Sequence, residues 1–364
     1  MFRPGQLLLP VFTAPMGGGV ATPELIASVS DCGGSGMIPA GEMPVDLARE
    51  RLRETQWRTA SPVGLHLHLT PGTRAEPAGL ARPASPPADP AALAAYRAGL
   101  LADAGALHTH LPLPSRDHDA ELADKVQLAI DHRLPYVSFT FGVPAADLVA
   151  ALHDSGVAVL VKVTSLPEAI AAADGGADVL VVQGPEAGGP SAIFDPAGTP
   201  DESVRLPDLV RDVAAATGLP VIATGGLTSG RSVRAVVEAG ASAVMLGTAL
   251  LRTPEAGTAS GHRRALTAPA FRISEFSRVF LGRPGRVLAN ELVRAQEKHV
   301  PLAHPWVAEL TLPLRTAAAS RTSMNKMAVW AGAGWRQISD EPAATVVGRL
   351  WESAGLRAPV GARW

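Results

Sequence analysis

Short apolar runs that do not alternate with polar residues recur along this chain, and each is followed by a segment that favours a helix. Such strands are typical of a parallel sheet covered on both faces, because neither face meets water. Eight of these runs can be counted, at 8–14, 36–39, 63–69, 136–142, 157–163, 179–183, 221–223 and 243–246. Eight alternating strand and helix units predict an α/β fold, with the strands closed into a (β/α)₈ TIM barrel. An open, doubly wound sheet has the same local pattern and is the alternative.

The pattern changes after Leu251. Residues 255–324 are richer in arginine and show helical signals without strand signals, which predicts a small helical cap that would bind substrate. We expect a barrel over 1–254, this cap over 255–324, and C-terminal helices over 325–364 that complete the barrel. Residues 71–90, rich in proline and alanine, predict a long irregular loop. The arginines at 263–264 and 283–286 are expected on a solvated face of the cap.

Composition limits the classes of partner. Of 364 residues, 47% are hydrophobic, and the net charge of −2 gives no reason to expect nucleic acid or an anionic membrane surface. The apolar run at 7–12 is too short to span a membrane. A single cysteine, Cys32, fits a reduced, cytoplasmic compartment. His108 and His110 have ligand spacing, but no third ligand cluster accompanies them, so no metal site is expected. The sequence allows a homodimer without indicating one.

Two glycine turns near the end of the predicted barrel point to a phosphate group. Ala223-Thr224-Gly225-Gly226-Leu227 and Val244-Met245-Leu246-Gly247-Thr248-Ala249 are each a strand that opens into glycine and then a helix, about one βαβ unit apart. In TIM barrels, the loops after strands 7 and 8 form a phosphate site with a helix N-terminus. Either turn alone could be no more than a tight connection; the tandem favours phosphate binding.

A further motif, Gln183-Gly184-Pro185-Glu186-Ala187-Gly188-Gly189, follows an apolar strand, at the end of the barrel where catalytic groups collect. With Ala14-Pro15-Met16-Gly17-Gly18, Lys162-Val163, Gly225-Gly226, Gly247-Thr248, Gly282-Arg283-Pro284 and Trp330-Ala331-Gly332, it resembles the nitronate monooxygenases, also called 2-nitropropane dioxygenases. These enzymes are related to the flavin-dependent enoyl-acyl-carrier-protein reductases. The resemblance extends over nearly the whole chain, in the same order.

The resemblance implies an FMN at the barrel mouth. Ala14, Pro15 and Met16 would line its ring system. Lys162 would lie at the pyrimidine edge, where a cation stabilises the reduced ring, and Gln183 would be a polar contact to the same region. Gly188 and Gly189 would pass close to the cofactor. Its phosphate would be bound by Gly225, Gly226, Gly247 and Thr248.

This chain departs from the family at the proton-transfer positions. The family motif continues Gly-Gly-His and supplies a catalytic base, whereas here Pro190 follows Gly189. Many members also have a histidine where this chain has Thr140. A general base contributes roughly 10²–10⁴-fold to such reactions. His66 or His68 could take over acid or base work, because the two-residue period places both on one face of a strand.

Three interpretations follow. The chain could be an FMN-dependent oxidoreductase that oxidises a different small organic substrate with O₂, or that works with NAD(P)H as an enoyl reductase or as a tailoring dehydrogenase of secondary metabolism. It could still oxidise nitronates supplied as the anion, where no deprotonation is needed. It could also be a flavin-binding, non-catalytic protein that serves a partner complex, which the retained lysine and glycines disfavour.

Overall fold

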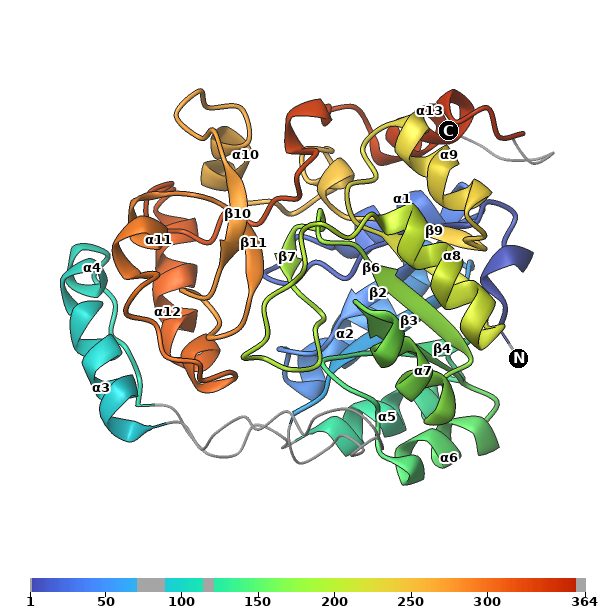
Figure 1. Ribbon diagram of the computed structural model, residues 1–364, viewed down its shortest axis with the longest axis horizontal. Helices are drawn as coiled ribbons and strands as arrows, with labels where there is room; N and C mark the ends of the chain where they lie inside the picture. Colours follow the sequence, from blue (N-terminus) through green and yellow to red (C-terminus); the bar gives the residue numbers. More distant parts are fainter. Residues whose placement is uncertain (1, 71–88, 114–120, 358–364) are drawn as a thin grey trace.

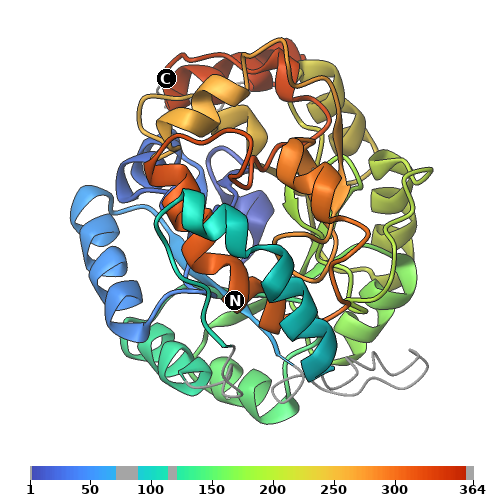
Figure 2. The same cartoon turned by 90° about the vertical axis from the view of Figure 1, so that its left-hand side faces the viewer.

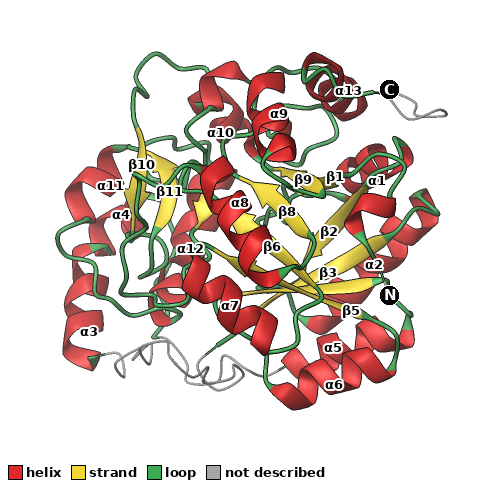
Figure 3. Ribbon diagram, turned by 45° about the vertical axis from the view of Figure 1, so that its right-hand side comes forward, coloured by secondary structure: helices red, strands yellow, loops and turns green. Residues whose placement is uncertain are grey.

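The computed structural model describes residues 2–70, 89–113 and 121–357. Eight parallel strands form a closed barrel in the order β1-β2-β3-β4-β5-β6-β8-β9, and β9 pairs with β1 (Figures 1 and 3). The strands are β1 Val11–Thr13, β2 Ser35–Pro39, β3 Val63–His68, β4 Tyr136–Thr140, β5 Ala158–Val163, β6 Val179–Gln183, β8 Val221–Thr224 and β9 Ala243–Leu246. The predicted barrel is confirmed, and the open sheet is excluded.

Helices enclose this barrel on its outer side (Figure 3). They are α1 Pro23–Asp31, α2 Val45–Arg58, α5 Leu122–Asp131, α6 Ala146–Asp154, α7 Leu166–Asp174, α8 Leu206–Thr217, α9 Gly230–Glu238 and α13 Ala343–Ser353. Helix α1 begins as its sequence predicts, with Thr22 accepting a hydrogen bond from the N–H of Leu25 and Pro23 in the first turn. Helix α13 packs against α1 and α9 and closes the ring.

The inside of the barrel is a packed core. Side chains that point inward, among them Phe12, Met37, Tyr136, Leu160 and Val181, form one buried cluster. The ring of Phe2 lies 4.6 Å from that of Tyr136 and joins this cluster. The outward-facing residues of the same strands pack under the helices, which explains why the strands are continuously apolar.

Two insertions build the cap. One follows β3 and contains α3 Pro90–Gly99 and α4 Leu101–Ala106; the other separates β9 from α13. They share a second hydrophobic cluster, in which the Tyr96 hydroxyl donates to the carbonyl of Val279 (2.7 Å). Lys326 forms an ion pair with Asp103. Figure 2, turned so that the cap side of Figure 1 faces the viewer, shows the cap helices lying across the ring of barrel helices.

The later insertion contains α10 Ser260–Ala265, β10 Ser274–Ser277, β11 Gly285–Leu288, α11 Glu291–Gln296 and α12 Trp306–Ser320. The prediction that 255–324 lack strands is therefore wrong. Strands β10 and β11 form an antiparallel sheet with β7 Gly189–Pro190, which follows β6. This sheet joins the cap to the loop that carries the Gln-Gly-x-Glu-Ala-Gly-Gly motif.

The expected solvated arginine face is also wrong in part. Arg283 and Arg286 are 1% and 4% exposed. Arg263 is partly buried, and its guanidinium donates to the carbonyls of Arg252, Thr253 and Ala256. The helical segment of the first insertion is divided into α3 and α4 at Leu100. The predicted loop at 71–90 lies mostly outside the described residues.

Candidate active site

The carboxyl ends of β3 to β6 bring the polar residues of the barrel together. In the strand register, His66 lies opposite Ser138 and His68 opposite Thr140. Lys162 is near the end of β5, and Gln183 ends β6. Parallel strands present their carboxyl ends at one edge, which is where TIM-barrel enzymes place their chemistry. The structure thus unites the site residues predicted on separate strands.

His66 and His68 lie on the same face of β3, as the two-residue period predicted, with ring centroids 5.7 Å apart. His66 is buried, and its Nδ1 is 3.1 Å from the Ser138 hydroxyl. Burial, together with the charge of Lys162, lowers the pKa of His66 well below its usual 6.5. Burial likewise lowers the pKa of His68 to about 4. Both imidazoles are therefore neutral at neutral pH.

Lys162 is partly exposed at the mouth, and no described carboxylate forms an ion pair with it. Desolvation lowers its pKa from 10.5 to about 8. The ammonium group is still mostly protonated at pH 7. A cation held without a protein counter-ion is suited to an anionic ligand.

Gln183 holds the loop after β6, and its expected contact to the FMN ring stays a prediction. Its Oε1 accepts from the N–H of Ala192 (2.7 Å), and its Nε2 donates to the carbonyl of Pro190 (3.2 Å). Both ends of the amide thus hold the loop after β6. Glu168 on α7 holds the same loop, because its Oε1 accepts from the N–H of Phe194 (2.7 Å). The role of Glu168 was not predicted from the sequence. The available signal was an acidic residue in the first turn of a helix.

The two glycine turns fit a phosphate group. Gly225 and Gly226 have positive φ values of 116° and 65°, so the backbone turns back at the end of β8. Thr248 begins a short 3₁₀ helix, and its Oγ1 accepts from the N–H of Gly332 (3.0 Å). No described residue accepts the Thr248 hydroxyl proton or the N–H groups of Gly225, Gly226 and Gly247. These donors at adjacent strand ends suit an anion.

The N-terminal motif lies beside these turns. A Cβ placed on Gly247 would lie 3.4 Å from the Cβ of Ala14 and 3.8 Å from the sulfur of Met16. Ala14, Pro15 and Met16 are partly exposed, whereas Phe12, deeper in β1, is fully buried. The residues expected to cradle FMN therefore line one accessible edge of the barrel, and their donors and small side chains fit such a group.

Pro190, at the position where the sequence resemblance leads us to expect a histidine, is held by backbone contacts. It pairs with Gly285 of β11, and its carbonyl accepts from Gln183. Gly189 has a φ of 84° and open space around its α-carbon, whereas a Cβ on Gly188 would overlap the backbone of Gly332. The close approach at Gly188 is therefore to the C-terminal segment, and a contact from either glycine to a cofactor stays a prediction.

The loop after β6 is also held from the cap by arginines. Arg283 donates to the carbonyl of Ile193, and Arg286 donates to the carbonyl of Pro185 (2.7 Å) and to Glu202. One sequence feature pointed to this segment, namely Gly282-Arg283-Pro284 in the family resemblance. Trp330, in the other late segment, packs its ring on Gly285.

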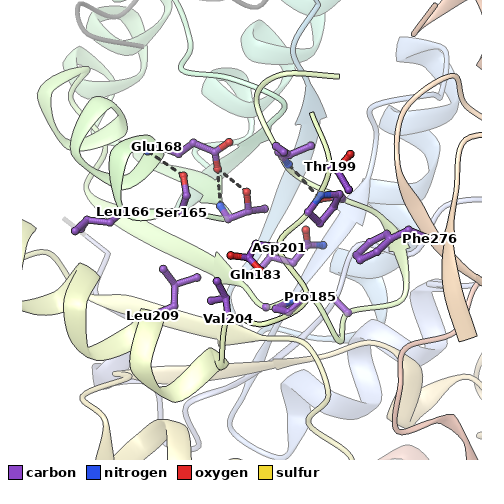
Figure 4. Close-up of a pocket in the computed structure, with 16 residues that line it drawn as sticks. Ser165, Leu166, Glu168, Gln183, Pro185, Thr199, Asp201, Val204, Leu209 and Phe276 are labelled. Atoms are coloured by element: carbon purple, nitrogen blue, oxygen red, sulfur yellow. Dashed lines mark hydrogen bonds between the residues drawn. The ribbon is translucent and has the colours of Figure 1, made fainter. Parts of the chain in front are cut away.

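A cavity of about 300 Å³ lies beside this loop (Figure 4). Its walls include Ser165, Glu168, Gln183, Asp201 and Phe276. Lys162 and His66 do not line it, so it flanks the strand-end cluster instead of coinciding with it. The strand ends are the candidate site, because His66, His68 and Lys162, whose pKa values are all lowered by burial, meet there.

The described residues hold neither a candidate metal cluster nor a candidate membrane span. No three His, Cys, Asp or Glu side chains lie close enough to hold a metal ion. Within the same residues, no helix is long and apolar enough to cross a membrane.

A closed parallel barrel with this cluster at its carboxyl edge defines an α/β-barrel enzyme. The sequence model of the nitronate monooxygenase family matches residues 6–352. Nitronate monooxygenases from Pseudomonas aeruginosa and Paraburkholderia phytofirmans are 35% and 33% identical to the chain. The two alignments each cover 94% of this chain, and 95% and 91% of the relatives. The chain belongs to the nitronate monooxygenase family, whose members are flavin-dependent oxidoreductases.

Two solved structures are similar to this chain in fold. A nitroalkane oxidase from Streptomyces ansochromogenes is 35% identical, with a TM-score of 0.87 and 97% of each chain covered. FabK from Thermotoga maritima is 22% identical, with a TM-score of 0.73 over 98% of this chain and 97% of that one. At that identity the second likeness concerns the fold alone.

Proposed function

We propose that this protein is an FMN-dependent enzyme that oxidises a small organic anion of the nitronate type, with O₂ as the electron acceptor. The substrate would arrive already deprotonated. Family membership supports flavin-dependent oxidation, and the chemistry of the mouth supports the choice of an anion.

The cofactor would be held by residues from several strand ends. Donors at Gly225, Gly226, Gly247 and Thr248 would bind the phosphate, and Ala14 to Met16 would line the ring system. When bound, FMN would supply the two-electron redox chemistry. The protein would orient the substrate against the ring and would place the positive charge of Lys162 beside the anion.

The observation that carries the proposal is the state of the titratable groups at the mouth. Lys162 is a cation with no carboxylate paired to it among the described residues, and His66 and His68 are neutral imidazoles of low basicity. An imidazole whose pKa is about 4 is a poor acceptor for the proton of a neutral nitroalkane. The same groups can donate hydrogen bonds to an oxyanion, and Lys162 can neutralise its charge.

Position 190 supports the same conclusion. Proline offers no proton acceptor, and Gln183 and β11 hold its backbone in place. In this proposal, Lys162 attracts and orients the anion, and His66, oriented by Ser138, donates a hydrogen bond to it. Neither residue has to remove a proton from carbon.

The cofactor claim is tested first. Purified protein should be yellow and should release one FMN, and no FAD, per chain on denaturation. Colourless protein that does not take up added FMN would contradict the proposal at its base.

The substrate claim is tested by comparing a preformed alkyl nitronate with its parent nitroalkane under identical conditions. We expect kcat/KM for the anion to exceed that for the neutral compound by about 10²-fold or more, the contribution of the missing base. Pro190→His should raise activity on the neutral compound, whereas Pro190→Gln, of similar size but without a base, should not. Equal use of both compounds by the unaltered protein would refute the proposal.

A further inference from the structure

His68 lies in a narrow slot at the mouth of the barrel. Its ring meets His66 at 5.7 Å and Phe141 at 4.9 Å between centroids. On the remaining side, a Cβ on Gly41 would overlap the imidazole. The ring remains partly exposed, in contrast to the buried His66. Barrel residues thus pack against the His68 ring on several sides, while part of the side chain stays exposed.

Phe141, which forms one wall of this slot, is itself held from the cap. The guanidinium of Arg283 lies 3.5 Å from the centroid of the Phe141 ring, and the ring of His304 lies 5.3 Å away. Phe141 has a φ of 75°, a left-handed backbone conformation that is strained for a non-glycine residue and persists only where its surroundings fix it. The ring's contacts with the cap supply that constraint.

Arg283 connects this wall to the loop that contains Pro190. It is 1% exposed and donates to the carbonyl of Ile193. Its neighbour Pro284 accepts a hydrogen bond from the N–H of Ser191 (2.9 Å). One cap residue therefore contacts both the aromatic wall beside His68 and the loop after position 190.

Charged groups surround His68 from several elements. Arg283, Lys162 and Lys125 act on it as positive charges, and exposed Glu42 acts in the opposite sense. Two further titratable side chains complete the set: His66 on the same strand and His304 across Phe141. The cation stacked on Phe141 thus favours the neutral form of the imidazole as well as fixing its neighbour.

We propose that Arg283 is a positioning residue for the substrate side of the site: from the cap it fixes Phe141 against His68, so that His68 presents an oriented imidazole to the substrate anion where the family uses a residue at position 190. This inference rests on the proposed function, because it assumes an anionic substrate at the mouth. Arg283 itself is buried, and it acts on the site through Phe141, through the loop at Ile193 and through its positive charge.

The test compares Arg283→Met with Arg278→Met. Arg278 lies in the same cap segment and donates to loop carbonyls at Ala197 (2.9 Å) and Gly198 (2.6 Å), but no contact joins it to Phe141. Both variants should lower Tm, since each loses contacts to the same loop. Only Arg283→Met should raise KM for an alkyl nitronate, by about tenfold, with kcat changed less. Phe141→Leu should raise KM similarly, and the double variant should add little.

The second readout needs no turnover. Histidine NMR titration of the cofactor-free protein, assigned with His68→Gln, should show a rise in the pKa of His68 from about 4 in Arg283→Met and no change in Arg278→Met. If nitronates are not substrates, the proposed function fails while this titration still tests Arg283. Equal effects of the two arginine substitutions on KM and on the titration, or no effect of either, would overturn the inference.

Discussion

Replacing Lys162 with methionine should stabilise the cofactor-free protein. The same change should strongly lower the activity of the FMN-loaded enzyme. Desolvation moves the Lys162 pKa from 10.5 to about 8. At about 1.4 kcal/mol per pKa unit, this displacement corresponds to about 3 kcal/mol by which the folded environment disfavours the charged form. Methionine has a similar length and no charge. The gain will be smaller than this upper figure, because the side chain is partly exposed.

The expected rise in Tm follows from the size of the chain. With an unfolding entropy of about 2 cal/mol/K per residue, 3 kcal/mol corresponds to about 4 °C for 364 residues. The pH dependence has a definite sign. Between pH 8 and 10.5 the unfolded chain binds more protons at Lys162 than the folded one, so the unfolding free energy of the unaltered protein rises with pH there. Lys162→Met should lack this rise.

The assay is thermal and denaturant unfolding of both proteins without cofactor at pH 7 and pH 10, together with kcat/KM on a nitronate. Lys298→Met, which removes an exposed lysine of the cap, is the control and should change neither quantity. Loss of the Lys162 charge should lower kcat/KM by about 10²-fold or more. A destabilised Lys162→Met protein, or one that keeps its activity, would refute the reasoning.

Three further predictions concern the loop after β6, the glycine turn after β8 and the buried histidines. Gln183→Leu should cost about 2 kcal/mol of unfolding free energy, because it breaks the bonds to Pro190 and Ala192, and hydrogen exchange should increase in that loop. Gly226→Ala should weaken FMN binding, since a side chain is strained at φ 65° and its Cβ would come within 3.0 Å of Glu186; fluorescence titration with FMN would measure this, and unchanged affinity would contradict the assignment. The unfolding free energy should fall as the pH drops from 6.5 to 4, because in this range the unfolded chain binds more protons at His68 and His262 than the folded protein does. Urea titrations of His262→Gln should show a smaller dependence of the unfolding free energy on pH.

The barrel could be predicted from the sequence because its signal is local. Most strands are largely apolar runs, such as Val157–Val163, and several helix starts are marked by a capping residue, as Thr22 marks α1. Strands β10 and β11 carry no such signal, because they are short and exist through pairing with each other and with β7. The pairing of β11 with β7 joins Gly285 to Pro190, about a hundred residues apart in the chain.

The site was predictable to the extent that it follows from strand register. His66, His68 and Lys162 lie close together because β3 and β5 flank β4 in the parallel barrel and the three side chains face inward. The hydrogen bonds of Gln183 to Pro190 and Ala192 could not be predicted, because both partners lie in a loop whose path depends on contacts with the cap. Arg283 was expected in solvent, as most arginines are, and is buried because carbonyl and aromatic partners from distant segments surround it.

The most direct test of the central claim is anaerobic mixing of the FMN-loaded protein with candidate electron donors, followed by visible absorbance. A preformed alkyl nitronate should bleach the flavin rapidly, and the yellow colour should return when O₂ is admitted. NADH and NADPH should leave it yellow. Bleaching by a nicotinamide nucleotide with none by nitronates would contradict the account and identify a reductase on the same barrel.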